Sequence, residues 1–364
     1  MGKKRIFVIA DIHFGKLDPV KQLEDLDKYF FSHCKTLSPD VIVIAGDIMD
    51  ERVSVNTTTA AIFHKFIDKL IDLNTRVLII EGTRSHDNNQ INIFSHKVSD
   101  KFKVYKSAVS DYIEGMKFLI IPEEYMTEPG KYYKKFLKDK YDFCFGHGMF
   151  SHISYLGKKS KLKKLTAPVW DYKKDFEDII SGRVVFGHIH THERFDKFCY
   201  VGSFGRYNHG EEEPKGFMYY EYDNIKKKII NEKFIENKNS DIFRSVNESS
   251  LPEDRNSLIK KLKDFVKTSY RLRIILNREI DKLRKSDIIS FCKNNLNTSI
   301  DNKYDKKKNK LEKEDSILSG NVSVKNKYED MDIVDATVEF VFENKGIKLD
   351  KELVIKTLND SKAL

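Results

Sequence analysis

The sequence has few cysteines and no cysteine motif. Its four cysteines, Cys34, Cys144, Cys199 and Cys292, form no CxxC pair, so we expect reduced thiols in a cytoplasm-like compartment. The opening MGKKRIFVIADIH has too short an apolar run for a signal peptide or a membrane span. Ile6 stands where N-myristoylation needs serine or threonine. We therefore expect a soluble, cytoplasmic protein without a membrane partner.

The sequence also lacks an excess of acidic residues. It has 65 Lys and Arg against 56 Asp and Glu in 364 residues, a net charge of +9. This balance suits a polyanionic partner such as nucleic acid, and would place the protein at the nucleoid. A Lys- and Asn-rich composition also arises from AT-rich coding DNA, in a cell or a virus, so charge alone does not decide. A hydrophobic fraction of 40% is enough for a core, and the length allows two or three domains.

Buried strands alternate with amphipathic helices from residue 5 to about 235. Strands are expected at 5–10, 40–46, 75–80, 117–121, 141–145, 183–187 and 198–202, helices at 19–37 and 59–73, and a hairpin at 216–223 and 227–236. Continuous apolar strands separated by helices indicate an α/β fold with a sheet covered on both faces. The sequence therefore predicts a first domain over 1–236.

The composition changes after residue 236. Helical periodicity around a strand with alternating arginines, YRLRIIL, predicts a small α+β module over 237–300. Residues 301–330 are polar with mixed charge, which is typical of a flexible linker. Residues 331–364 are predicted to form two short helices with an apolar stripe of Ile333, Val334, Val338, Val341 and Phe342. That stripe either packs back onto the body or docks onto a partner.

Metal-binding side chains follow five of the predicted strands. They are Asp11 and His13, Asp47 and Asp50, Ser85 with His86 and Asp87, His147, and His188 with His190. Open α/β sheets bind ligands at the carboxyl ends of their strands. Imidazole and carboxylate together suit Mn²⁺, Fe²⁺ or Zn²⁺ better than Mg²⁺. Each motif alone is weak, but their agreement at five strand ends predicts one metal centre.

The motifs in these positions resemble those of a known family. DIH, GDIMD, GTRSHD, GHG and GHIHTH are similar to the DxH, GDxxD, GNHD, GH and GHxH blocks of calcineurin-like metallophosphoesterases. YVGSFGRYNHGEEEPKGFMYYEYD, at 200–223, resembles the segment that closes the nuclease domain of Mre11/SbcD proteins. The resemblance implies a four-layer α-β-β-α sandwich followed by an α+β cap module and a C-terminal helix pair. Beyond residue 223 the resemblance rests only on the order of the segments and their general composition.

The resemblance also implies two divalent metal ions, with Mn expected before Mg. The implied ligands are Asp11, His13 and His190 for one ion, His147, His188 and the position of Ser85 for the other, and Asp47 as a bridge. Two ions roughly 3.5–4 Å apart can bind both the scissile phosphate and an attacking hydroxide.

His86 would act on the leaving group as a general acid. Asp50 would orient His86, although a capping or turn role is the alternative for Asp50 and also for Asp87. His192 is expected at the surface and not as a ligand.

Ser85 departs from the motif of the family. The family has asparagine immediately before the catalytic histidine, whereas this chain has Ser85, with Thr83 and Arg84 ahead of it. Serine offers a shorter, neutral hydroxyl in place of the amide carbonyl. We therefore expect weaker occupancy of the second metal site and a stronger dependence on added Mn²⁺.

Basic residues in three segments are candidates for contacts with a DNA backbone. They are Lys158, Lys159, Lys161, Lys163 and Lys164 in one run, Arg206 in the closing segment, and Arg271 and Arg273 in the cap module. Backbone contacts give affinity without sequence specificity. For the lysine run, a solvated loop is the alternative.

Three functions are compatible with the sequence. The resemblance favours a Mn-dependent exonuclease and endonuclease of DNA repair or recombination, acting on double-stranded DNA ends and single strands. It also implies a homodimer and a Rad50/SbcC-like ATPase bound through residues 331–364. The alternatives are a stand-alone phosphoesterase for a nucleotide or phosphoprotein, and a non-catalytic DNA-end scaffold.

Overall fold

A computed structural model of the chain describes residues 2–54, 56–87, 90, 101–126, 128–152 and 167–304. The lysine run, the predicted linker beyond residue 304 and the predicted C-terminal helix pair lie outside the described residues. Residues 1–275 and 281–300 group into one compact unit. No helix in the described part of the chain is long and apolar enough to cross a membrane.

Two six-stranded sheets form the centre of the fold. The first has the order β14-β13-β1-β2-β3-β4. Its strands β1 (Lys3–Ile9), β2 (Val41–Ala45), β3 (Arg76–Ile80) and β4 (Phe102–Tyr105) are parallel. Strand β13 (Gly216–Asp223) pairs antiparallel with β1, and β14 (Lys228–Glu236) pairs antiparallel with β13. The second has the order β11-β12-β10-β7-β6-β5. Its strands are β5 (Val109–Ile113), β6 (Met116–Ile121), β7 (Tyr141–His147), β10 (Ile180–Gly187), β11 (Glu193–Phe195) and β12 (Phe198–Tyr200). A short pair, β8 (Met149–Phe150) and β9 (Val169–Trp170), lies apart from both.

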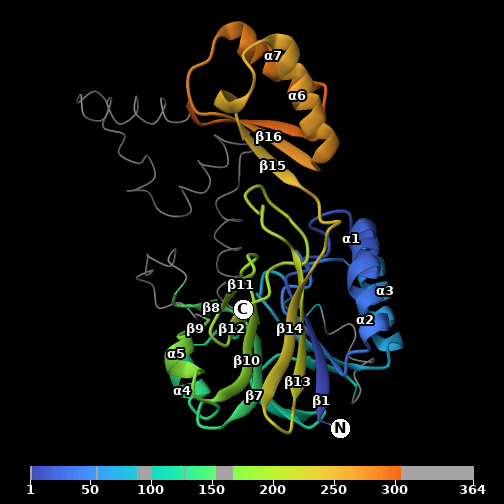
Figure 1. The fold of residues 1–364 in the computed structure, drawn as a ribbon, viewed down its shortest axis with the longest axis vertical. Coiled ribbons are helices and arrows are strands. Elements are labelled where there is room, and N and C mark those ends of the chain that lie inside the picture. Colours follow the sequence, from blue (N-terminus) through green and yellow to red (C-terminus); the bar gives the residue numbers. More distant parts are fainter. Residues whose placement is uncertain are drawn as a thin grey trace, which may run out of the picture. The chain divides into compact units, whose positions relative to one another are not determined.

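Helices cover the outer face of each sheet, as Figure 1 shows for α1–α3 on one side and α4 and α5 on the other. They are α1 (Pro19–Asp25), a π-helical turn (Leu26–Phe31), α2 (Ser32–Leu37), α3 (Thr58–Asp72), α4 (Pro129–Tyr133) and α5 (Tyr172–Asp175). Local capping explains where the longer ones begin. Asp18 accepts a hydrogen bond from Val20 N with proline at the next position, and Thr57 accepts one from Ala60 N.

Three apolar cores hold the four layers together. Phe7, Ile9, Ile42 and Ile44 face the helices α1–α3. Alternate residues of the same strands, such as Val8 and Val43, face Phe118 and Phe145 of the second sheet. The third core lies between the second sheet and the short helices α4 and α5. The expected four-layer α-β-β-α sandwich is therefore confirmed. The apolar strands are covered by helices on one face only, because the other face packs on a second sheet.

Residues 243–302 form a separate three-stranded sheet with two helices. Its elements are β15 (Phe243–Asn247), a 3₁₀ turn (Glu248–Ser250), α6 (Arg255–Thr268), β16 (Arg271–Leu276), α7 (Lys282–Lys293) and β17 (Thr298–Asn302), with the strand order β15-β16-β17. Asp254 and Asp281 cap the two helices by accepting hydrogen bonds from Ser257 N and Arg284 N. This segment therefore contains both helices and strands, and its bounds as a separate α+β module stay a prediction.

Candidate metal centre

The carboxyl ends of five strands bring the predicted ligands together. Asp11, Asp47 and His86 follow β1, β2 and β3 of the first sheet, while His147 ends β7 and His188 follows β10 of the second. The centre therefore lies across the ends of both sheets. Backbone hydrogen bonds join the first two loops, from Asp11 N to Gly46 O (3.0 Å) and from His13 N to Asp47 O (3.1 Å).

Two glycines allow these loops to approach closely. Gly46 has φ +81°, and a Cβ there would lie 2.2 Å from His147 Nδ1. A Cβ on Gly82 would lie 2.3 Å from Asp47 N. No side chain fits at either distance, so both motifs need glycine.

The loops also hold uncommon backbone conformations. Asp11, His13, Asp47 and His188 have φ values of 50°, 48°, 48° and 98°. A non-glycine residue in the left-handed region costs roughly 1–3 kcal/mol and persists where its surroundings fix it, often at functional sites. Four of the predicted metal ligands therefore hold a strained backbone conformation.

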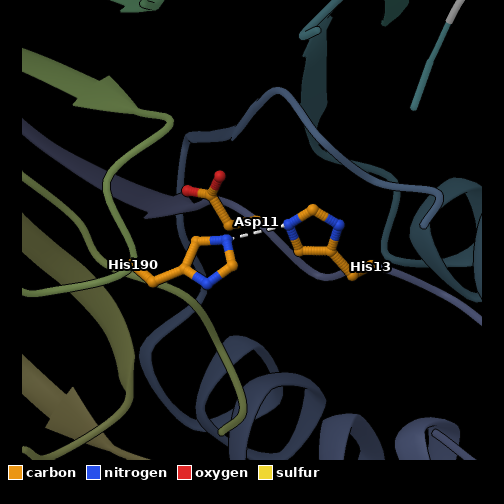
Figure 2. A group of neighbouring side chains, drawn as sticks. All are labelled: Asp11, His13 and His190. Carbon is orange, nitrogen blue, oxygen red and sulfur yellow. Dashed lines mark hydrogen bonds between the residues drawn. The ribbon is translucent and has the colours of Figure 1, made fainter. Parts of the chain in front are cut away.

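Asp11, His13 and His190 form the first ligand group. Figure 2 shows the His13 and His190 rings directed at each other beside the Asp11 carboxylate, and their Nε2 atoms are 3.0 Å apart. Both Asp11 carboxylate oxygens accept hydrogen bonds from His188 N at 3.1 Å. His190 Nδ1 lies 3.0 Å from Glu211 Oε1, which leaves Nε2 free to bind a metal.

Asp47, His147 and His188 form the second ligand group. His147 Nε2 lies 3.3 Å from Asp47 Oδ2, while its Nδ1 donates to Ala45 O at 2.8 Å. That second bond fixes the ring with Nε2 toward the cluster. A carboxylate that sequence reasoning missed, Glu123, reaches the same place from the loop after β6. Its Oε2 is 3.2 Å from His188 Nδ1 and 3.7 Å from His147 Nε2.

Ser85 does not join this group. It is exposed, and the described part of the structure gives it no contact with the other predicted ligands. Thr83 faces this group instead. Its Oγ1 is 3.2 Å from Asp47 Oδ2, 3.4 Å from His147 Nε2 and 3.0 Å from Glu123 Oε2. Thr83 directly follows Gly82, so the residue of this motif that faces the second group stands two positions before Ser85.

His86 and Asp50 lie beside the two ligand groups. His86 Nε2 lies 4.0 Å from Asp47 Oδ2, and His86 Nδ1 donates to the backbone carbonyl of Asp50. The Asp50 carboxylate faces His13 Nδ1 at 3.7 Å and Lys16 Nζ at 3.3 Å. Asp50 thus contacts His86 through its main-chain carbonyl, while its carboxylate faces His13 and Lys16.

Asp87 has the turn role that was the alternative for it. Its buried carboxylate accepts hydrogen bonds from Ile48 N (2.9 Å), Met49 N (3.2 Å) and Gly82 N (2.9 Å). Burial and the nearby charge of Asp47 raise the pKa of Asp87 to about 7. The residue joins the loop after β2 to the loop after β3. His192 is not part of the cluster, since its ring stacks on Phe234.

The donor set fits divalent metal ions. Two atoms about 2.1 Å from one cation lie roughly 3.0–3.4 Å from each other, which matches the contacts of 3.0 Å and 3.3 Å within the two groups. The buried Nδ1 atom of His188 has no hydrogen-bond partner among the described residues. Burial lowers the pKa of His13 to about 3, so its imidazole is neutral, as a ligand must be. Nitrogen and oxygen ligands in this mixture suit first-row transition metals.

The predicted DNA contacts are only partly described. The Arg206 guanidinium is half-buried and donates to Ser240 O (3.3 Å) and Glu212 O (3.4 Å). Arg271 is exposed, and Arg273 donates to Ser245 Oγ at 3.1–3.2 Å. The five lysines of the basic run lie outside the described residues.

Comparison with known proteins gives a family and more distant similarities. Residues 4–192 match the calcineurin-like phosphoesterase family. Over 141 residues the chain is 29% identical to the SbcD subunit of nuclease SbcCD from Staphylococcus epidermidis, and the match covers 36% of this chain and 37% of that protein. A solved structure described as a predicted phosphoesterase from Streptococcus pneumoniae TIGR4 is 14% identical, covering 61% of this chain and 85% of that one with a TM-score of 0.27. Another solved chain is also 14% identical, and the match covers 64% of this chain and 99% of that one with a TM-score of 0.40.

Proposed function

Because the chain belongs to the calcineurin-like phosphoesterase family, we propose that it is a divalent-metal-dependent nuclease that hydrolyses phosphodiester bonds at DNA ends. One observation carries the proposal. Two groups of ligand side chains, centred on His13 and His147, converge at the strand ends with Asp47 and His86 beside them.

Each part of the cluster has a proposed role. Asp11, His13 and His190 hold one ion, and His147 and His188 hold the other, with Asp47 between them. When bound, two such ions supply an activated hydroxide and neutralise the charge on the phosphate.

His86 is the proposed general acid. Its Nδ1 is held by the Asp50 carbonyl, and Nε2 is the nitrogen turned toward Asp47. His86 is thus oriented to give a proton from Nε2 to the leaving sugar oxygen.

Two observations favour DNA as the substrate. The similar stretch of the Staphylococcus epidermidis protein belongs to a nuclease, and the net charge of +9 suits a polyanion. Arg206, Arg271 and Arg273, with the five lysines of residues 158–164, are proposed backbone contacts. Because imidazole ligands favour Mn²⁺ over Mg²⁺, manganese is the proposed ion.

The proposal extends to the assembly. The relative is named as one component of the nuclease SbcCD, and we propose a Rad50/SbcC-like ATPase as the partner of residues 331–364 in this chain. The apolar stripe of that segment supports a docking role. The domain boundaries at 236, 300 and 330, action in DNA repair or recombination, and a homodimer are part of the same proposal.

Cleavage of an end-labelled linear duplex by the purified chain, titrated with Mn²⁺, tests the function. The wild type should digest DNA only with metal, and His86→Ala should lower the rate by about 10²–10⁴-fold, the usual contribution of a general acid. His33→Ala, on α2 and outside the cluster, is the matched control and should keep full activity. Turnover of a small aryl phosphodiester without cleavage of any DNA at any Mn²⁺ concentration would overturn the nuclease proposal in favour of a small-substrate phosphoesterase.

A further inference from the structure

We propose that Glu123 is a ligand of the second metal ion and that, together with Thr83, it replaces the asparagine of the GNHD motif. The inference rests on the proposed metal-dependent function and names a residue that completes the same site. Glu123 follows β6, a strand whose end carries none of the family motifs.

The position of the Glu123 carboxylate is that of a ligand. Its Oε2 lies 3.2 Å from His188 Nδ1, and that nitrogen has no hydrogen-bond partner among the described residues although it is buried. A close nitrogen–oxygen pair without hydrogen-bond geometry is expected where both atoms face a common cation. The distance falls in the range of roughly 3.0–3.4 Å for two ligands of one ion.

Burial gives an independent argument. The Glu123 side chain is 5% exposed, and among the described residues no lysine or arginine forms an ion pair with it. A carboxylate buried to this degree is stable as an anion only beside a positive partner, and a divalent cation held by Glu123 and the two imidazoles would supply one.

Thr83 and Arg84 of the GTRSHD motif help to hold this carboxylate. Tyr125 donates from its hydroxyl to Glu123 Oε1 at 2.6 Å, which leaves Oε2 toward the cluster. The Arg84 guanidinium lies over the Tyr125 ring, 5.0 Å from its centroid. Thr83 Oγ1 lies 3.0 Å from Glu123 Oε2. The altered motif and the new carboxylate therefore form one connected network.

The charge of the site follows from this assignment. An asparagine carbonyl is neutral, whereas Glu123 adds a negative charge beside that of Asp47. Two carboxylates and two imidazoles bind a divalent ion more strongly than one carboxylate, two imidazoles and a serine hydroxyl. The weak second site expected from Ser85 is thus replaced by a strong one.

Mn²⁺ binding to the full chain, measured by titration calorimetry with electron paramagnetic resonance of free Mn²⁺, tests the assignment without using activity. We expect two ions per wild-type chain. Glu123→Gln keeps the size of the side chain and should weaken one of the two ions at least about tenfold. Glu124→Gln is the matched control, because Glu124 is engaged by Tyr133 and Ala108 N instead. Two ions bound by Glu123→Gln with wild-type affinity, or one ion by the wild type, would overturn the inference.

Further variants keep the test decisive if Glu123→Gln folds poorly. Tyr125→Phe removes only the hydrogen bond to Oε1 and should weaken the same ion by a smaller factor. Thr83→Asn in the Glu123→Gln background should restore the second ion, while Ser85→Asn should not; the opposite result would place the ligand at Ser85. Two tightly bound ions without DNA cleavage would refute the nuclease proposal and leave this inference standing.

Discussion

Glu211, for which the sequence predicts no role, contacts Nδ1 of the His190 ring, the nitrogen that does not face His13. Glu211 Oε1 lies 3.0 Å from His190 Nδ1, and Oε2 accepts from Tyr207 N at 3.0 Å. Burial opposes the charge of Glu211, but the contacts with His190 and the Tyr207 amide hold its pKa at about 2. An ionised carboxylate behind a metal-binding imidazole fixes its orientation and raises its basicity.

Glu211→Gln should therefore weaken the first metal ion. The neutral amide keeps one contact but not the charge, and loss of such a partner lowers metal affinity about 10–100-fold. Calorimetric titration with Mn²⁺ measures the change. Glu213→Gln is the control, since Glu213 pairs with Thr191 and Lys215 and not with a ligand side chain. Equal affinities of Glu211→Gln and wild type would contradict the role given to Glu211.

Sequence reasoning at this scale found the residues that carry the family motifs. It missed Thr83 because the motif was aligned on its histidine, which makes Ser85 the counterpart of the asparagine. Aligned on Gly82, the counterpart is Thr83. It missed Glu123 because only motif-bearing strand ends were searched. Glu123 lies two residues beyond a strand that the sequence does predict, so a search of every strand end would have found it.

Among the elements, the β5–β6 hairpin joins the two sheets by charge. Glu114 (φ 52°) and Gly115 (φ 75°) form its turn. The Glu114 carboxylate accepts from Lys4 Nζ of β1 at 2.7 Å and from Arg76 Nε of β3 at 3.1 Å. Hydrogen bonding to Lys4 outweighs partial burial and, with Arg76, lowers the pKa of Glu114 below its ordinary 4.5.

Glu114→Gln should lower the free energy of unfolding at neutral pH by about 1 kcal/mol or less, as expected for partly exposed ion pairs. Because the pKa of Glu114 is lowered on folding, its stabilising effect is present above pH 4.5 and is lost as the pH falls through the folded-state value. Denaturant unfolding at neutral and acidic pH measures this. Glu128→Gln, in an exposed pair with Lys131, should change little at either pH. A difference for Glu114→Gln that persists in acid would exclude the electrostatic cause.

The continuous apolar strands of both sheets were predicted, because burial on two faces leaves an unmistakable run such as VIVIA in β2. The expected hairpin of β13 and β14 was also correct. The missed strands are short or lie near the sheet edges. β8 and β9 have two residues each, and β5 has four of its five residues partly or fully exposed. Such strands are fixed by their neighbours and not by their own composition.

At the scale of the whole molecule, the ligands come from both sheets. Asp11 and Asp47 belong to loops of the first sheet, and His147 and His188 to those of the second. Ions bound among them favour the folded state, because the unfolded chain does not assemble the site.

Removal of metal should therefore destabilise the protein. At a free Mn²⁺ concentration of 100 times the dissociation constant, each independent site adds about 2.7 kcal/mol to the free energy of unfolding. Thermal unfolding in Mn²⁺ and in EDTA measures the difference. Asp47→Ala should lose most of the gain, since Asp47 belongs to the second ligand group and is the proposed bridge to the first. Equal unfolding temperatures with and without metal would contradict binding at this centre.

The contact between Thr83 and Glu123 has a consequence for the history of the chain. The two residues are 40 positions apart, yet their side chains share one place in the fold. Under the proposed assignment, a lineage that exchanges the motif asparagine for threonine keeps its enzyme only if an acid arises after β6, so the two changes are inherited as a pair. A motif search that treats a changed GNHD block as loss of catalysis would classify such a protein as inactive. Under the proposed assignment the protein has only supplied one metal ligand from another loop.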